Sequence, residues 1–116
     1  MATEVLTVDY KSSCFAHTAA TVAKLFYVIN GMVWLALNTA GANEDNVFVY
    51  GADMLRVPKA TGQAWAPGTK VYYDAGASNF TTTASGNTLA GIVNEPADAA
   101  DVEGIIDFQS AAFVNA

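Results

Sequence analysis

The segment 27–37 reads YVINGMVWLAL and places Asn-Gly between two runs that are apolar at nearly every position. Asn-Gly is the strongest two-residue signal for a β-hairpin, because a type I′ turn requires a positive φ at both central residues. We therefore expect a hairpin that turns at Asn30 and Gly31. In this register Ile29 lies opposite Met32, and the pairing continues outward from the turn.

Both faces of the expected hairpin are apolar. Successive side chains of a strand point to opposite sides of the sheet. One side then carries Leu25, Tyr27, Ile29, Met32, Trp34 and Ala36. The other side carries Phe26, Val28, Val33, Leu35 and Leu37, with Lys24 at its end. Because one side lines the core of a small domain, the other needs a second layer of the same chain, or another protein, to cover it.

The composition indicates the same shortage of polar surface. Hydrophobic residues make up 53% of the chain and charged residues 14%, whereas an average soluble domain carries roughly 25% charged residues. The 116 residues suggest one domain. A domain of this length buries enough surface to form a core without a disulfide or a metal.

The remaining sequence reads as short β-strands separated by turns. The β-type runs are Val5–Val8, Val47–Tyr50, Met54–Val57, Lys70–Asp74, Phe80–Thr83, Thr88–Val93 and Val102–Phe108. Gly51 lies between two of these runs and predicts a bulge or a tight bend. Residues 11–23 are small and weakly patterned, which predicts a loop or one short helical turn. About eight short strands without a long helix predict an all-β domain, a small β-barrel or sandwich.

The charge balance argues against a nucleic-acid partner. Eleven acids and five bases give a formal net charge of −6. Nucleic-acid binders normally gather their bases into a stripe, but here the bases are scattered at Lys11, Lys24, Arg56, Lys59 and Lys70. No apolar run approaches the ~18 residues of a membrane span, so we also expect no membrane partner. The start, MATEVLTVDYKSS, lacks the features of a secretory signal, which predicts synthesis in a cytoplasm, with retention there or release by lysis.

Neither a metal site nor a catalytic site is expected. Cys14 and His17 are the only Cys and the only His, whereas a structural zinc needs four ligands and a nucleophilic dyad needs a group that orients the histidine. Calcium ligation by Asp98, Asp101 and Glu103 would lack the EF-hand spacing. The acids of the last quarter are therefore interpreted as a solvated face. We expect no cofactor and no enzymatic activity.

The segment 57–93 carries a resemblance to a known family. It reads VPKATGQAWAPGTKVYYDAGASNFTTTASGNTLAGIV and resembles the head-decoration, or capsid cement, proteins of tailed bacteriophages. The matching positions are Val57, Pro58, Lys59, Ala60, Thr61, Gly62, Trp65, Gly68, Lys70, Val71, Tyr72, Asp74, Ser85, Gly86, Asn87, Thr88, Leu89 and Gly91. The resemblance extends over about residues 25–109, whereas residues 9–24 depart from the family pattern.

The resemblance implies a β-barrel-like domain that binds the outer surface of a phage head in the virion. It also implies the major capsid protein as partner, and assembly as a homotrimer at local three-fold positions of the shell. Under this interpretation residues 17–116 form the decoration domain. Residues 1–16 form an N-terminal strand, which is either an edge strand of the same barrel or an arm that adds to a sheet of the capsid protein.

These expectations define a set of candidate interface residues. They combine the N-terminal strand, one face of the hairpin and a loop tryptophan, and they are Val5, Leu6, Val8, Tyr10, Tyr27, Ile29, Met32, Trp34 and Trp65. Trp65 has a second interpretation, as a plug that anchors its loop to the core. An alternative function is a carbohydrate-binding or cell-adhesion domain displayed on the virion, in which Trp34, Trp65, Tyr72 and Tyr73 stack on sugar rings.

Overall fold

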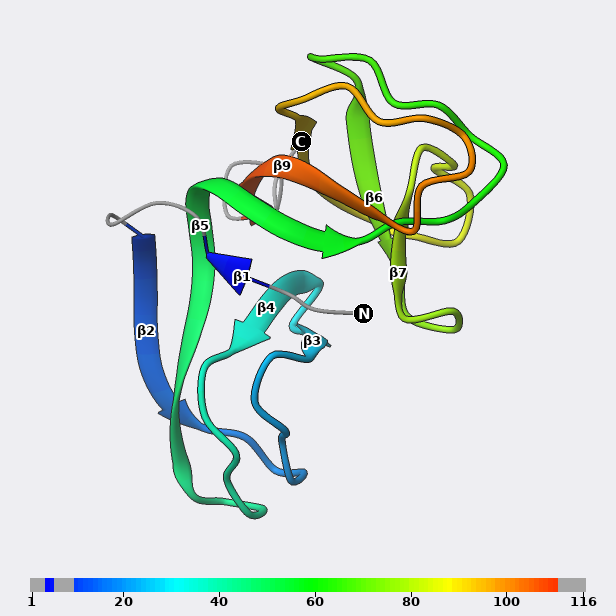
Figure 1. Cartoon of the computed structure of the whole chain (residues 1–116). Helices are drawn as coiled ribbons and strands as arrows, with labels where there is room; N and C mark the ends of the chain where they lie inside the picture. Colours follow the sequence, from blue (N-terminus) through cyan, green and yellow to red (C-terminus); the bar gives the residue numbers. More distant parts are fainter. Residues whose placement is uncertain (1–3, 6–9, 111–116) are drawn as a thin grey trace.

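The computed structural model describes the backbone of residues 4–5 and the whole of residues 10–110. This part of the chain contains nine β-strands and no α-helix, which confirms the all-β prediction (Figure 1). The strands are β1 (Glu4–Val5), β2 (Tyr10–Ala16), β3 (Phe26–Ile29), β4 (Met32–Ala36), β5 (Asp45–Pro58), β6 (Lys70–Asp74), β7 (Asn79–Thr81), β8 (Thr88–Val93) and β9 (Glu103–Gln109).

The strands form one antiparallel sheet that curls into a half-barrel. Its order is β3-β4-β5-β9-β8-β6-β7, and β1 and β2 both pair with β5 outside this path. An isolated bridge joins Lys59, just after β5, to Phe80 of β7, and the amide of Ala60 donates to the Phe80 carbonyl at 2.9 Å. This bridge brings the last strand of the path back to the end of β5.

The long strand β5 belongs to two parts of the sheet. Residues 48–49 pair with β4, and residues 51–58 pair with β9. The register with β9 shifts between Ala52 and Leu55, and the register with β2 shifts between Lys11 and Ser12. The sequence predicted a bulge at Gly51 and two strands around it. The bulge is confirmed, and the two predicted strands are one bent strand that passes from the lower-left part of Figure 1 into the curled part.

The prediction of a loop or helical turn for residues 11–23 is wrong over its first half. Residues 10–16 form β2, which pairs with β5 from Tyr10 opposite Ala52 to Ala16 opposite Asp45. The sequence YKSSCFA has little intrinsic β-preference, because Ser, Lys and Ala are poor strand formers. The strand exists because β5 offers it a backbone edge, and such a long-range pairing leaves no local pattern.

The Asn-Gly hairpin forms in the predicted register. Ile29 lies opposite Met32, and Phe26 lies opposite Leu35. The turn residues Asn30 and Gly31 have φ values of +55° and +78°, as a type I′ turn requires.

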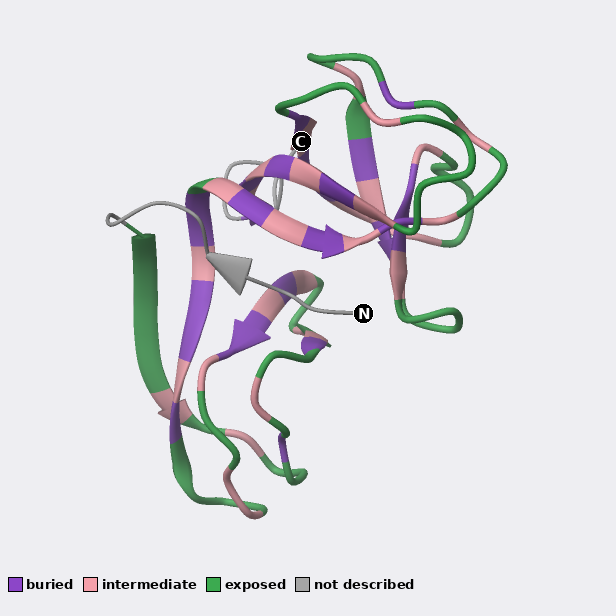
Figure 2. Cartoon of the chain, viewed as in Figure 1, coloured by how far each residue is buried: buried purple, intermediate pink, exposed green. Residues whose placement is uncertain are grey.

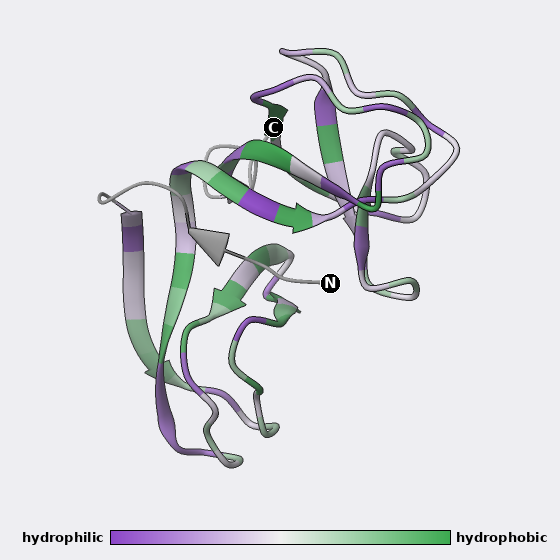
Figure 3. Cartoon of the chain, viewed as in Figure 1, coloured by the Kyte–Doolittle hydropathy of each residue, from purple (hydrophilic) through white to green (hydrophobic). Residues whose placement is uncertain are grey.

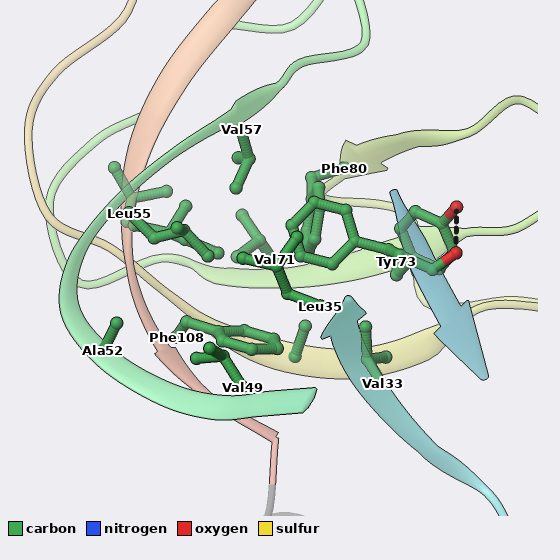
Figure 4. Packing of buried hydrophobic residues seen from close by; sticks show 14 of the residues in the cluster. Val33, Leu35, Val49, Ala52, Leu55, Val57, Val71, Tyr73, Phe80 and Phe108 are labelled. Carbon is green, nitrogen blue, oxygen red and sulfur yellow. Dashed lines mark hydrogen bonds between the residues drawn. The ribbon is translucent and has the colours of Figure 1, made fainter. Parts of the chain in front are cut away.

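The core lies inside the curl of the sheet, where side chains from β3 to β9 converge (Figure 4). It contains Phe26, Val33, Leu35, Val49, Ala52, Leu55, Val57, Trp65, Val71, Tyr73, Phe80, Ala90, Val93, Ile106 and Phe108. Phe26 packs against Phe80 with ring centroids 4.8 Å apart, and against Tyr73 at 5.6 Å. These contacts tie the hairpin to β6 and β7.

Candidate functional site

One side of the hairpin faces the core. Phe26, Val33 and Leu35 are buried there. Val28 shares this side but lies near the turn in β3, the first strand of the sheet path, and it keeps 41% of its surface exposed. The side that carries Phe26 therefore supplies the core, and the side that carries Trp34 points away from it.

The side that points away from the core carries a second aromatic cluster. Phe15 stacks on Phe48 with ring centroids 4.4 Å apart. Trp34 packs edge-on against Phe15 at 5.0 Å and against Tyr50 at 5.6 Å. Phe48 is fully buried beneath these rings, whereas Phe15, Trp34 and Tyr50 remain partly exposed. The chain thus covers this side of the sheet only in part, with aromatic side chains that come from strands of the sheet itself.

The hairpin extends this cluster toward its turn. Tyr27, Ile29 and Met32 are half-buried on the same side of the sheet. We call the surface formed by these residues and the second cluster the aromatic face; its members are Phe15, Tyr27, Ile29, Met32, Trp34, Phe48 and Tyr50. Figure 3 shows mostly hydrophobic residues along β4 and along the part of β5 beside it, whereas the lower end of β5 is hydrophilic.

Two polar groups of the aromatic face are bonded to the chain's own backbone. The Trp34 Nε1–H donates to the Ile29 carbonyl at 3.2 Å, and the Tyr27 hydroxyl accepts from the Val22 amide at 2.7 Å. No member of the face carries a formal charge. What this surface offers a partner is mostly hydrocarbon and ring area, which is the character of the buried centre of a protein–protein interface.

More exposed apolar side chains lie beside the hairpin. Val22 and Leu25 are 49% and 50% exposed, and the Leu25 amide donates to the Val22 carbonyl at 3.2 Å. By strand alternation Leu25 lies on the same side as Tyr27. Contiguous apolar surface of this kind is typical of an interaction site rather than of free monomer surface.

The N-terminal candidates lie elsewhere. Tyr10 begins β2 and is 46% exposed. Val5 pairs through its backbone with Leu55 of β5, which favours the edge-strand interpretation for residues 4–5. Leu6 and Val8 lie outside the described residues.

Among residues 10–110, no group of three or more His, Cys, Asp and Glu side chains is arranged to hold a metal ion. In the same part of the chain, no helix has the length and apolar character needed to cross a membrane. The apolar aromatic face is thus the strongest candidate for a functional surface.

The sequence profile of the phage cement protein family matches residues 8–108. The chain belongs to the phage cement protein family. No curated protein and no solved structure gives a significant match to it. The match begins before β2, so it includes the segment 9–24, which departs from the sequence motifs of the family.

Membership of this family associates the protein with the phage capsid, in a structural class that is not an enzyme class. The motif residues that carry the family resemblance lie mainly in the curled part of the sheet. Gly91 is one example, because a Cβ at this position would collide with the backbone carbonyl of Asp107. Only glycine permits β8 and β9 to approach so closely.

Trp65 belongs to the same structural set. It is 2% exposed, and its ring covers Gly104 of β9. The buried Lys59 ammonium lies 5.6 Å from the ring centroid and donates to the carbonyls of Ala60 at 3.0 Å and Asp101 at 3.3 Å. Trp65 therefore anchors its loop to the core, and its side chain is not accessible to a partner in this structure.

The aromatic face also contains residues that the sequence did not single out. Phe15 was placed in a predicted loop, and Phe48 and Tyr50 were assigned only to a strand. The alternation of VFVY over residues 47–50 was the available signal, because it sets the two aromatic rings on one side of a strand. Nothing local indicated that Phe15 would stack on Phe48.

Proposed function

We propose that this cement protein binds the outer surface of the assembled phage head through its aromatic face and bridges neighbouring capsid subunits. The observation that carries the proposal is the partly covered cluster around Trp34, which the chain leaves open on the side away from its core. Aromatic residues are enriched at the centres of interfaces and often dominate the binding energy. Membership of the phage cement protein family supports a capsid protein as the partner.

Binding of this kind stabilises a shell by mass action. A protein that binds the assembled shell but not the separated subunits adds RT ln(1 + [L]/Kd) per site. At ~100-fold excess over Kd this amounts to ~2.7 kcal/mol per site, and a shell offers many sites. Bridging adjacent subunits opposes their separation under the pressure of packed DNA.

A homotrimer at local three-fold positions suits this role, because one trimer reaches three neighbouring subunits at once. The linkage of three sites raises the avidity without any new contact. Light scattering of the purified protein measures this assembly directly; a mass of three chains supports the trimer, and a mass of one chain contradicts it.

The test of head binding compares two matched substitutions. Met32→Glu puts a carboxylate on the aromatic face, and Val102→Glu puts one at a residue that is 51% exposed in the acid-rich loop before β9. Undecorated heads are mixed with each purified protein, sedimented and heated. We expect the wild type and Val102→Glu to co-sediment and to raise the disruption temperature of the heads. Met32→Glu should bind at least about tenfold more weakly, because burial of an unpaired charge is costly.

Two results would contradict the proposal. In the first, the wild type adds neither mass nor heat resistance to the heads. In the second, Met32→Glu binds as tightly as Val102→Glu, in which case a different surface meets the shell. Binding of the wild type to a glycan array without binding to heads would favour the carbohydrate alternative.

A further inference from the structure

Strand β2 pairs with β5 along one edge, and none of the described residues pairs with its outer edge, which we call the open edge. Six of its seven residues are exposed, Phe15 being the exception. Figure 2 shows this strand as an exposed ribbon at the margin of the molecule.

The ladder with β4 shows which backbone groups of β2 point outward. The Leu37 amide donates to the Val47 carbonyl at 3.0 Å, so the backbone groups of Val47 face β4. Groups alternate between the two edges of an antiparallel strand, and those of Phe48 therefore face β2. Its partner there is Ser13.

It follows that the backbone N–H and C=O groups of Ser13 and Phe15 point toward β5. The N–H and C=O groups of Ser12, Cys14 and Ala16 point to the open edge. Proteins usually protect such edges with proline, charge or a bulge. Here the only charge of the strand is Lys11, and the bulge lies between Lys11 and Ser12. Residues 12–16 therefore have none of these protections. The residues whose N–H and C=O groups point outward, Ser12, Cys14 and Ala16, have small side chains.

This open edge adjoins the aromatic face. Phe15 lies on β2 and stacks on Phe48. A strand added outside β2 would place every second side chain beside Phe15, on the side of the sheet that carries Trp34. One extended segment would then contact both the open backbone edge and the rings.

We propose that β2 receives an extended segment of a capsid subunit as an additional antiparallel strand. This inference rests on the proposed function, since it names how the same surface holds its partner. Backbone pairing gives such strand addition its affinity, and alternate side chains give it specificity. The segment has about five residues, one for each residue of the run 12–16, and apolar side chains at alternate positions.

Lys11 is the only charged residue of β2 and lies near its N-terminal end. An antiparallel segment therefore carries an acid near its C-terminal end, beside Lys11. These exposed charges contribute to register more than to affinity.

A proline substitution tests the open edge. Cys14→Pro removes an outward N–H and leaves the pairs of Ser13 and Phe15 with β5 in place. The matched control is Ala99→Pro, at the second position of an exposed turn closed by the Asp101 amide and the Asp98 carbonyl at 3.0 Å, where proline is favoured. We expect both variants to keep the wild-type melting temperature and mass. In co-sedimentation with undecorated heads, Cys14→Pro should bind about tenfold more weakly, and Ala99→Pro as the wild type does.

Hydrogen exchange gives a second readout that needs no variant. The amides of Ser12, Cys14 and Ala16 should exchange rapidly in the free protein and become protected on heads. If the wild type binds heads but Cys14→Pro binds equally well, or these amides stay unprotected, strand addition is wrong and the proposed function stands. If the amides are already protected in the free protein, a second copy or the chain itself fills the edge, which also overturns the inference. If the wild type does not bind heads, the proposed function itself fails.

Discussion

Gly104→Ala tests whether Trp65 serves the fold rather than a partner. A Cβ on Gly104 would collide with Cζ3 of Trp65 and would lie 2.6 Å from Cε3, whereas ordinary contacts begin near 3.4 Å. The ring would have to move by at least about 0.8 Å, yet it is 2% exposed and packed inside the core. Overpacking of this kind costs about 1–3 kcal/mol, which corresponds to a loss of about 4–12 °C in melting temperature for a domain of this size.

The assay is urea denaturation of four proteins: the wild type, Gly104→Ala, Trp65→Phe and the double variant. Trp65→Phe alone leaves a cavity and destabilises the protein, but it also removes ring atoms that the new methyl group would strike. We therefore expect the double variant to be at least about 1 kcal/mol more stable than the sum of the single effects, as for residues in direct contact. Additivity within about 0.5 kcal/mol would refute this account of Trp65.

Three further substitutions probe other parts of the fold. Asn46→Ala removes the bond from the buried Asn46 amide to Thr21 Oγ1 at 2.9 Å, and we expect a loss of about 1–3 kcal/mol in urea denaturation; an unchanged midpoint would refute it. Gly31→Val forces a β-branched residue to a φ of +78°, and a loss of about 1–2 kcal/mol should follow, whereas an unchanged midpoint would show that the turn relaxes freely. Burial raises the pKa of Tyr73 above its ordinary value of 10.0, so the neutral phenol stabilises the fold below pH 10 and this stability is lost as the pH rises through the folded pKa. Ultraviolet titration should show a component above pH 10 that disappears in Tyr73→Phe, and an unchanged titration curve would contradict it.

The hairpin could be predicted in detail because its determinants are local. Asn30 and Gly31 fix the turn, the turn fixes the register, and the register fixes which side chains share a face. The sequence also indicated that both faces are apolar. Which face the core would take depends on Phe80 and Tyr73, far along the chain, and no local pattern contains that information.

Strand β2 and the aromatic cluster show the limit of local patterns more sharply. The segment 10–16 becomes a strand only against β5, whose paired residues lie between 29 (Ala16 to Asp45) and 42 (Tyr10 to Ala52) positions later in the sequence. The Phe15–Phe48 stack likewise forms only because β2 pairs with β5. Trp65 had two interpretations for a related reason, since its ring is buried by close packing on Gly104 of β9, far along the chain from the Trp65 loop.

The family resemblance depended mainly on residues of the curled part of the sheet, where close approaches tolerate few side chains. Gly91 and the Lys59–Trp65 pair belong to this class. The aromatic face lies within the matched range 8–108 but outside the motif positions between Val57 and Gly91, on side chains that only need to be large and apolar. The motif positions that carried the resemblance most clearly are therefore separate from the surface proposed to bind the shell.

Oxidative footprinting by mass spectrometry, applied to the free protein and to protein bound on phage heads, measures directly whether the aromatic face meets the shell. Hydroxyl radicals label Met32, Trp34 and Tyr27 in proportion to their exposure, and Tyr72 on β6 serves as the reference. We expect labelling of the three aromatic-face residues to fall strongly on binding, while that of Tyr72 changes little. Unchanged labelling of Trp34 and Met32 on fully decorated heads would contradict it.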